Sequence, residues 1–135
     1  MEVVLAFALL WDVRFCSAED YRRVLDGCAI ASEDRALLQG LANMGRFRES
    51  RTDTARLAAR LLEENLSDLD VRAFAEVLFR GVERARRMVR FEEESFTQLG
   101  YALWLALPEI LRERDPFVSL KEEFQQSLPP GVANG

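Results

Sequence analysis

The sequence contains no histidine among its 135 residues. This absence excludes serine and cysteine nucleophiles that depend on a histidine base, and zinc or di-iron sites that require histidine ligands. The two cysteines, Cys16 and Cys28, are too few for a disulfide framework and lack the spacing of a zinc site. We therefore expect no catalytic residues, no metal site and no cofactor.

Glycine and proline are also scarce, with 7 and 4 residues. The glycines occur singly, so the sequence has no glycine-rich phosphate-binding loop. The apolar share of 49% and the charged share of 30% are typical of a globular chain. A chain of this length can bury its own core without metal or disulfides. We expect one domain over residues 1–128 and a disordered tail over residues 129–135.

The apolar run over residues 3–11 is too short to span a membrane. It is not typical of a signal peptide either, because Glu2 precedes it in place of positive charge, and Asp12 and Arg14 follow it. We expect a cytoplasmic or otherwise intracellular protein with no membrane association. Periodicity alone does not decide whether residues 3–11 form a helix or a strand.

Helix start signals are frequent in this sequence. Serine or aspartate followed by acidic or amide residues can accept hydrogen bonds from the first free N–H groups of a helix. Such signals occur at residues 17–20, 32–34, 67–70, 95–98 and 115–116. Between them, apolar residues recur every three or four positions, which is the period of a helix and not of a strand. The pattern predicts an all-α fold.

Residues 3–11 and 99–111 are apolar nearly all round. Helices without a polar face are usually buried on every side, so we expect residues 3–15 and 96–111 to form the two most buried helices, at the centre of the fold. Pro108 should kink or break the second segment. Residues 45–52 form the one polar connection of any length. We predict a single compact bundle of about six or seven helices.

The net charge of −5 is unevenly distributed. Residues 1–42 carry −3, residues 43–90 carry +3 and residues 91–135 carry −5. The overall negative charge argues against a dedicated nucleic-acid binder. Only the middle third of the chain carries a positive net charge, so this argument does not apply to it.

An arginine stripe lies in that third. On a helix from Asp68 to Phe91, Arg80, Arg84 and Arg87 fall at spacings of four and three, and therefore on one face. Further arginines flank this stripe or precede it in the connection: Arg90, Arg46, Arg48 and Arg51. Together they form a candidate contact surface for a partner or for phosphates.

The same face also contains acidic residues. Glu76 and Glu83 lie at helical spacing from the arginines, and we expect them to pair with Arg80, Arg84 or Arg87. Under that interpretation the face is an ordinary salt-bridged helix surface. Contact with RNA, DNA or an acidic protein is the alternative.

Carboxylate clusters occur at residues 63–64 and 92–94. A magnesium-dependent nucleotide hydrolase would need the two clusters to face each other across a pocket. Neither cluster continues into the Glu-Glu-x-x-Glu spacing of helical pyrophosphatases. We rank this hypothesis last and expect solvated carboxylates.

Most aromatic residues fall on predicted core faces. Phe79 and Phe91 lie away from the centre of their helix's apolar stripe, and Phe47 lies between two arginines. Aromatic side chains left exposed are candidate anchors for a partner. These three residues are our candidate hydrophobic anchors.

The hypothesis that fits best is a non-enzymatic interaction or regulatory module that docks as an adaptor on a larger protein, with self-association also open. The alternative is a small helical subunit of a nucleoprotein assembly, which contacts RNA or DNA phosphates through the arginine stripe.

Overall fold

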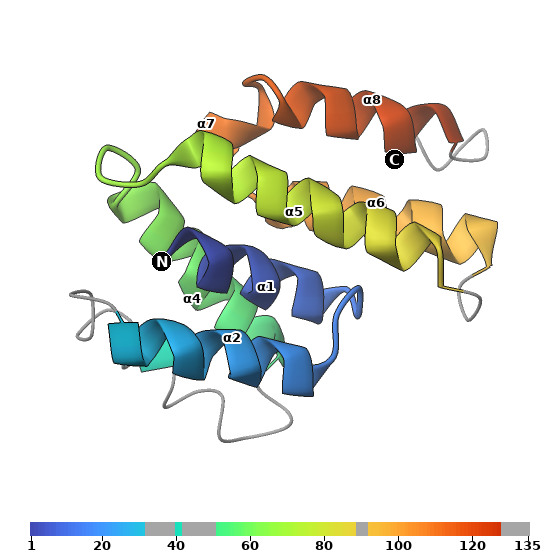
Figure 1. The fold of residues 1–135 in the computed structure, drawn as a ribbon. Helices are drawn as coiled ribbons and strands as arrows, with labels where there is room; N and C mark the ends of the chain where they lie inside the picture. Colours follow the sequence, from blue (N-terminus) through green and yellow to red (C-terminus); the bar gives the residue numbers. More distant parts are fainter. Residues whose placement is uncertain (32–39, 42–50, 89–91, 128–135) are drawn as a thin grey trace.

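The computed structural model describes residues 1–31, 40–41, 51–88 and 92–127, and these residues form helices and no strand (Figure 1). The predicted all-α fold is confirmed. The helices of the described residues are α1 (Glu2–Asp12), α2 (Ala18–Ala31), α4 (Arg51–Glu64), α5 (Val71–Arg86), α6 (Glu93–Ala106), α7 (Glu109–Arg112) and α8 (Phe117–Ser127). The predicted helix start at residues 32–34 and the predicted tail at 129–135 lie outside this part of the chain.

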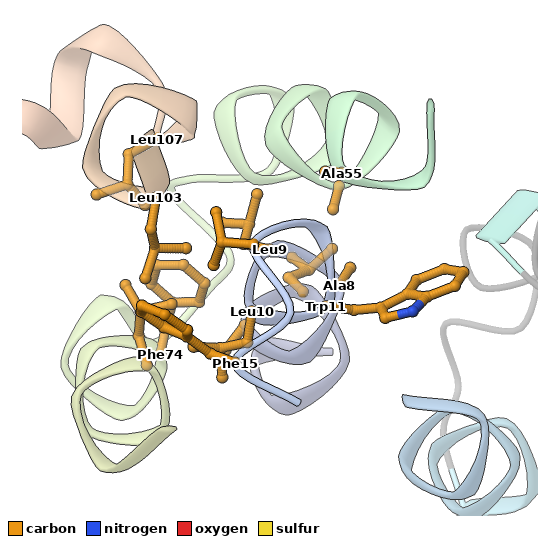
Figure 2. Packing of buried hydrophobic residues seen from close by; sticks show 14 of the residues in the cluster. Ala8, Leu9, Leu10, Trp11, Phe15, Ala55, Phe74, Leu103 and Leu107 are labelled. Atoms are coloured by element: carbon orange, nitrogen blue, oxygen red, sulfur yellow. The ribbon is translucent and has the colours of Figure 1, made fainter. Parts of the chain in front are cut away.

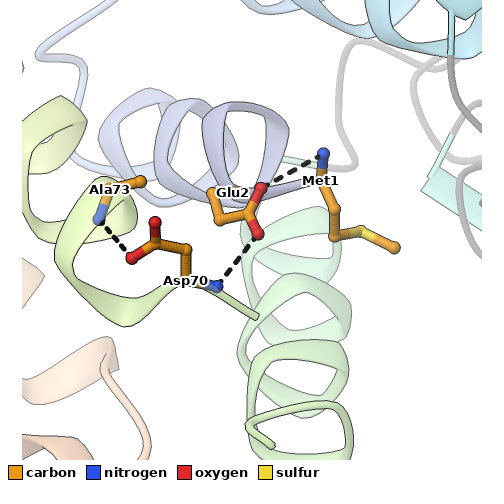
Figure 3. A network of polar contacts seen from close by, with 4 residues as sticks. All are labelled: Met1, Glu2, Asp70 and Ala73. Carbon is orange, nitrogen blue, oxygen red and sulfur yellow. Dashed lines mark hydrogen bonds and ion pairs between the residues drawn. The ribbon is translucent and has the colours of Figure 1, made fainter. Parts of the chain in front are cut away.

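The predicted helix start at residues 17–20 has the expected hydrogen bonds, whereas the start predicted at residues 67–70 is wrong, because Asp70 and not Ser67 caps α5, which runs from Val71 to Arg86 and not from Asp68 to Phe91. Ser17 Oγ accepts from the backbone N–H of Asp20 at 3.0 Å, and the Ser17 N–H donates to the Asp20 carboxylate at 3.4 Å. At the start of α5, the Asp70 carboxylate accepts from the N–H of Ala73 at 3.1 Å. The Asp70 N–H donates to the Glu2 carboxylate at 3.1 Å, which joins the first turn of α1 to the start of α5 (Figure 3).

Three other predicted boundaries are also wrong by a few residues. Helix α6 begins at Glu93 and not at Ser95, because Glu92 takes the extended N-cap conformation and Glu93 and Glu94 fill the first turn. Carboxylates there are stabilised by the positive end of the helix dipole. Helix α4 begins at Arg51, inside the predicted connection over 45–52, and α8 begins one residue after Pro116.

Helix α1 lies among the other helices, so residues 3–11 are helical (Figure 1). It has its most extensive contacts with α4 and α5, and it also contacts α2 and α6. Leu9 and Leu10 are fully buried among side chains from other helices, such as Phe74 and Leu103 (Figure 2). This burial confirms that residues 3–15 belong to the core.

Helices α6 and α8 form the other main contact of the fold. The rings of Phe96 and Phe124 meet edge to face at 5.6 Å, and the ring of Phe15 stacks on Phe96 at 5.2 Å. Gly100 lets the two helices approach closely, because a Cβ atom there would overlap the Phe124 ring. As predicted, the helix breaks at Pro108, where α6 has ended and α7 begins.

The segment over residues 96–111 is largely buried but not on every side. Phe96, Leu103 and Trp104 belong to the core. Leu105 and Ile110, however, are 48% and 54% exposed. The expectation that this segment has no solvent-facing side is therefore wrong. In the described part of the chain, no helix has both the length and the apolar character needed to cross a membrane.

Candidate interaction surfaces

The predicted arginine stripe lies on α5. Arg80 and Arg84 are exposed within the helix, and Arg87 is exposed at its C-cap. All three line one groove of about 390 Å³ together with Phe79 and Glu83. We call this set the arginine face. The helical spacing in the sequence thus brings the three guanidinium groups together.

The predicted acidic partners do not pair with these arginines. Glu83 pairs instead with Arg86, at 3.6 Å, and Arg86 also pairs with Glu123 of α8. The Arg86 guanidinium lies 5.4 Å from the centre of the Phe96 ring, so it is held on the α6 and α8 side of α5. In the described residues no ion pair joins Glu76 or Glu83 to Arg80, Arg84 or Arg87. The expected salt-bridged face is therefore wrong for these three residues.

One carboxylate from a neighbouring helix lies within electrostatic range of the arginine face. Partial burial would raise the pKa of Asp20, but its hydrogen bonds with Ser17, and the positive charges of Arg84 and Arg23, lower that pKa. Asp20 is therefore ionised at neutral pH. Its oxygens already accept from the backbone N–H of Ser17, at the start of α2.

The other predicted contact residues are not brought to this face. Arg51 begins α4 and does not line the groove. The remaining candidates lie outside the described residues: Arg46, Arg48, Arg90, Phe47 and Phe91.

Phe79 is the one candidate anchor that the structure describes. It is half-buried, and its ring meets the Phe117 ring edge to face at 6.2 Å. Its remaining surface lines the groove of the arginine face and a second hollow of about 500 Å³ toward the α7–α8 turn. The Phe79 ring therefore packs against Phe117 and contributes to the lining of both hollows, and it does not project freely into solvent.

Among the described residues, the large apolar side chains that project into solvent are Leu105, Ile110 and Val3. Sequence reasoning missed all three because it assigned both of their segments to the core. A finer signal was present within α6, since Phe96, Gly100 and Leu103 recur at spacings of four and three and define its buried side. Leu105 falls about 200° away from Leu103 around a helix, on the opposite side.

A cleft of about 570 Å³ is lined in part by the residues that lie between Leu105 and Ile110 in the chain. Its lining comes from the end of α1, from α4 and from the α6–α7 junction. The residues are Asp12, Thr52, Ala55, Arg56, Ala59, Arg60, Glu63, Ala106, Leu107, Pro108, Glu109 and Arg112. Leu105 and Ile110 come directly before and after the lining residues 106–109. We call Leu105, Ile110 and this cleft the α6–α7 surface.

The cleft has small or apolar residues between charged ones. Three of the lining residues are arginines and three are acidic, so the lining has no net charge. Arg56 pairs with Asp53 at 3.9 Å, and Thr52 Oγ1 donates to the Asp12 carboxylate at 3.3 Å. The Arg112 guanidinium lies 5.8 Å from the Trp104 ring centre, and its Nε is buried without a hydrogen-bond partner. The cleft therefore presents both positive and negative side chains around its small and apolar lining residues.

The carboxylate clusters do not face each other. Glu63 lines the cleft, whereas Glu93 lines a separate hollow beside Phe96 and Phe124. Among the described residues, no three acidic or cysteine side chains gather closely enough to hold a metal ion. The arrangement that the magnesium hypothesis requires is therefore not found in this part of the chain.

Reactive groups in the core are shielded from water. Cys16 is 7% exposed, and its thiol donates to the Phe7 carbonyl at 3.5 Å. Burial raises the pKa of this thiol to about 12, so it is protonated at neutral pH and a poor nucleophile. Buried polar atoms without a partner occur in Tyr21, Thr54 and Trp104, but these residues lie on three different helices.

Comparisons with protein families, with curated proteins and with solved structures find no match to this chain.

Proposed function

We propose that this protein is a non-enzymatic interaction module that docks on a larger protein through the α6–α7 surface. The observation that carries the proposal is the exposure of Leu105 and Ile110. Leu105 lies within residues 95–108, which carry no charged side chain, and Ile110 follows two residues after this stretch. Full burial of a large aliphatic side chain is worth about 1.5–3 kcal/mol, and roughly half of that remains to be gained at Leu105 and Ile110, which are 48% and 54% exposed. A partner that covers them recovers this free energy.

The layout of this surface resembles a protein interface. Interfaces combine an apolar centre with a polar rim that supplies hydrogen bonds and ion pairs. Here Leu105 and Ile110 supply the apolar part. Arg60, Glu63 and Glu109 supply charges of both signs in the adjoining cleft. The partner we propose presents apolar side chains to Leu105 and Ile110, and charges complementary to those of the cleft.

The test is affinity purification from the native host, with nuclease present, of three tagged forms of the full chain. The forms are the unchanged protein, the double variant Leu105→Gln with Ile110→Gln, and the control Val3→Gln. Glutamine is chosen because it is tolerated in helices and carries no charge that would act on the helix dipole. Val3 is a matched control, since it is also an exposed aliphatic residue but lies on α1.

We expect a protein partner to be retained by the unchanged chain and by the Val3→Gln control, and to be lost with the double variant. A loss of at least about tenfold corresponds to 1.4 kcal/mol of binding free energy. Circular dichroism would show that the double variant is folded. If no protein is retained and the purified chain is monomeric, or if the double variant retains the same partner equally well, the proposal is wrong.

A further inference from the structure

We propose that the arginine face of α5 is a second binding surface, separate from the α6–α7 surface, and that it takes the phosphodiester backbone of single-stranded nucleic acid. Arg80, Arg84 and Arg87 line the groove together, and none of them pairs with a carboxylate of the described residues. Guanidinium groups bind phosphate oxygens through two parallel hydrogen bonds. The face therefore offers three unused positions for phosphate.

The spacing of the arginines fits an extended chain of phosphates. From Arg80 to Arg87 the helix rises by about 10 Å. A single strand that follows α5 would meet the three guanidinium groups in turn. Because contacts of this kind are made to the backbone, the surface would have little preference for base sequence.

Phe79 favours nucleic acid over an acidic protein as the occupant. Its ring is held by the edge-to-face contact with Phe117, and its free surface lines the same groove as the arginines. Surfaces that bind single strands combine a basic track with an aromatic side chain on which a base stacks. An acidic peptide would use the arginines but would have no need of the ring.

The negative net charge of the whole chain does not prevent this binding. At physiological ionic strength, charges are screened over about 8 Å, so the local arrangement governs the contact. The nearest acidic groups are already engaged: Glu83 pairs with Arg86, and Asp20 accepts from the Ser17 N–H. Neither carboxylate neutralises the arginine face through an ion pair of its own.

The experiment measures binding of fluorescently labelled single-stranded RNA and single-stranded DNA of mixed sequence by anisotropy, over a series of salt concentrations. We expect binding that weakens with salt, with a log-log slope of about −2 for three phosphates. The triple variant Arg80→Gln, Arg84→Gln, Arg87→Gln should lower the affinity at least about tenfold and flatten the slope. The RNA and DNA arms show which strand is preferred, and a preference for either supports the proposal.

The matched control is the triple variant Arg56→Gln, Arg60→Gln, Arg114→Gln, which removes the same charge from exposed arginines elsewhere. It should bind within about twofold of the unchanged chain, because bulk charge contributes little beyond the screening length. Absence of binding at low salt, or equal losses in both triple variants, would overturn the proposal. So would polyglutamate that binds as tightly and with the same dependence on the arginine face.

This inference and the proposed function fail independently. The Leu105→Gln, Ile110→Gln variant should bind the labelled strands as the unchanged chain does. The Arg80, Arg84, Arg87 variant should still retain the protein partner in the presence of nuclease.

Discussion

Helices α1 and α6 make an instructive pair, because both belong to apolar stretches yet only one of them is enclosed. From Val4 to Trp11, α1 exposes almost nothing apart from part of Phe7. Helix α6 buries Leu103 and Trp104 but leaves Leu105 in solvent. Composition alone did not separate the two helices.

The difference follows from the number of neighbours that each helix has. Helix α1 contacts α2, α4, α5 and α6, which together cover most of it and leave Val3, near its first turn, exposed (Figure 1). Helix α6 packs mainly on α8 and makes smaller contacts with α1, α4 and α5. One side of α6 therefore has no helix against it among the described residues. An apolar side chain on that side is available to a partner.

The difference in burial between α1 and α6 is tested most directly by truncating one leucine in each helix. Leu9→Ala should lower the free energy of unfolding by about 2–5 kcal/mol, because it leaves a cavity at a fully buried position. Leu105→Ala should lower it by less than about 1 kcal/mol, because that side chain is half in solvent already. Urea unfolding followed by circular dichroism measures both values. Similar losses for the two variants would mean that α6 is covered in the folded monomer.

The second test compares the glycines at which these helices meet a neighbour. Gly100→Ala would press a Cβ atom against the Phe124 ring, and we expect a loss of about 1–3 kcal/mol in the free energy of unfolding. Gly81→Ala would press against the end of the Leu10 side chain, which can turn away more easily than a ring. We expect a smaller loss there. Chemical denaturation of both variants checks the order, and a larger loss for Gly81→Ala would contradict it.

The third test uses pH to measure how well the Cys16 thiol, which follows α1, is shielded from water in the folded state. Burial raises the pKa of the Cys16 thiol from 9.0 to about 12, so between these values the unfolded chain loses a proton that the folded chain keeps. The free energy of unfolding should then fall as pH rises above about 9, with a slope that approaches 1.4 kcal/mol per pH unit. Denaturant unfolding at pH 8, 9 and 10 measures it.

The control for this pH effect is Cys16→Ala, which should flatten the slope between pH 9 and 10. Cys28 is present in both forms, so its own titration cancels in the comparison. An unchanged slope in Cys16→Ala would show that water reaches the Cys16 thiol in the folded state.

Local features were predicted well from the sequence. The cap at Ser17 depends on a side chain that bonds to a backbone group three residues away, so its spacing along the chain is sufficient to find it. The cap of α5 was placed three residues too early, at Ser67 and not at Asp70. The start of α6 was wrong because the serine at 95 and the carboxylates before it compete for the same role. Only the backbone conformation of Glu92 decides between them.

The surfaces were predicted only in part. The arginine face was found, since helical spacing alone brings Arg80, Arg84 and Arg87 together. The ion pairs on this face were predicted wrongly, because Glu83 pairs with Arg86, and Arg86 is in turn held by Phe96 of α6 and Glu123 of α8. The α6–α7 surface was missed because its exposure depends on which helices lie nearby.

By itself, the sequence determined that this chain is helical, where several helices begin, and which residues share a helix face. These properties depend on hydrogen bonds and spacings within a few residues. The tertiary structure decided which apolar faces are covered, which carboxylate pairs with which arginine, and where the cleft lies. Those outcomes depend on contacts between residues far apart in the chain, which local patterns do not encode.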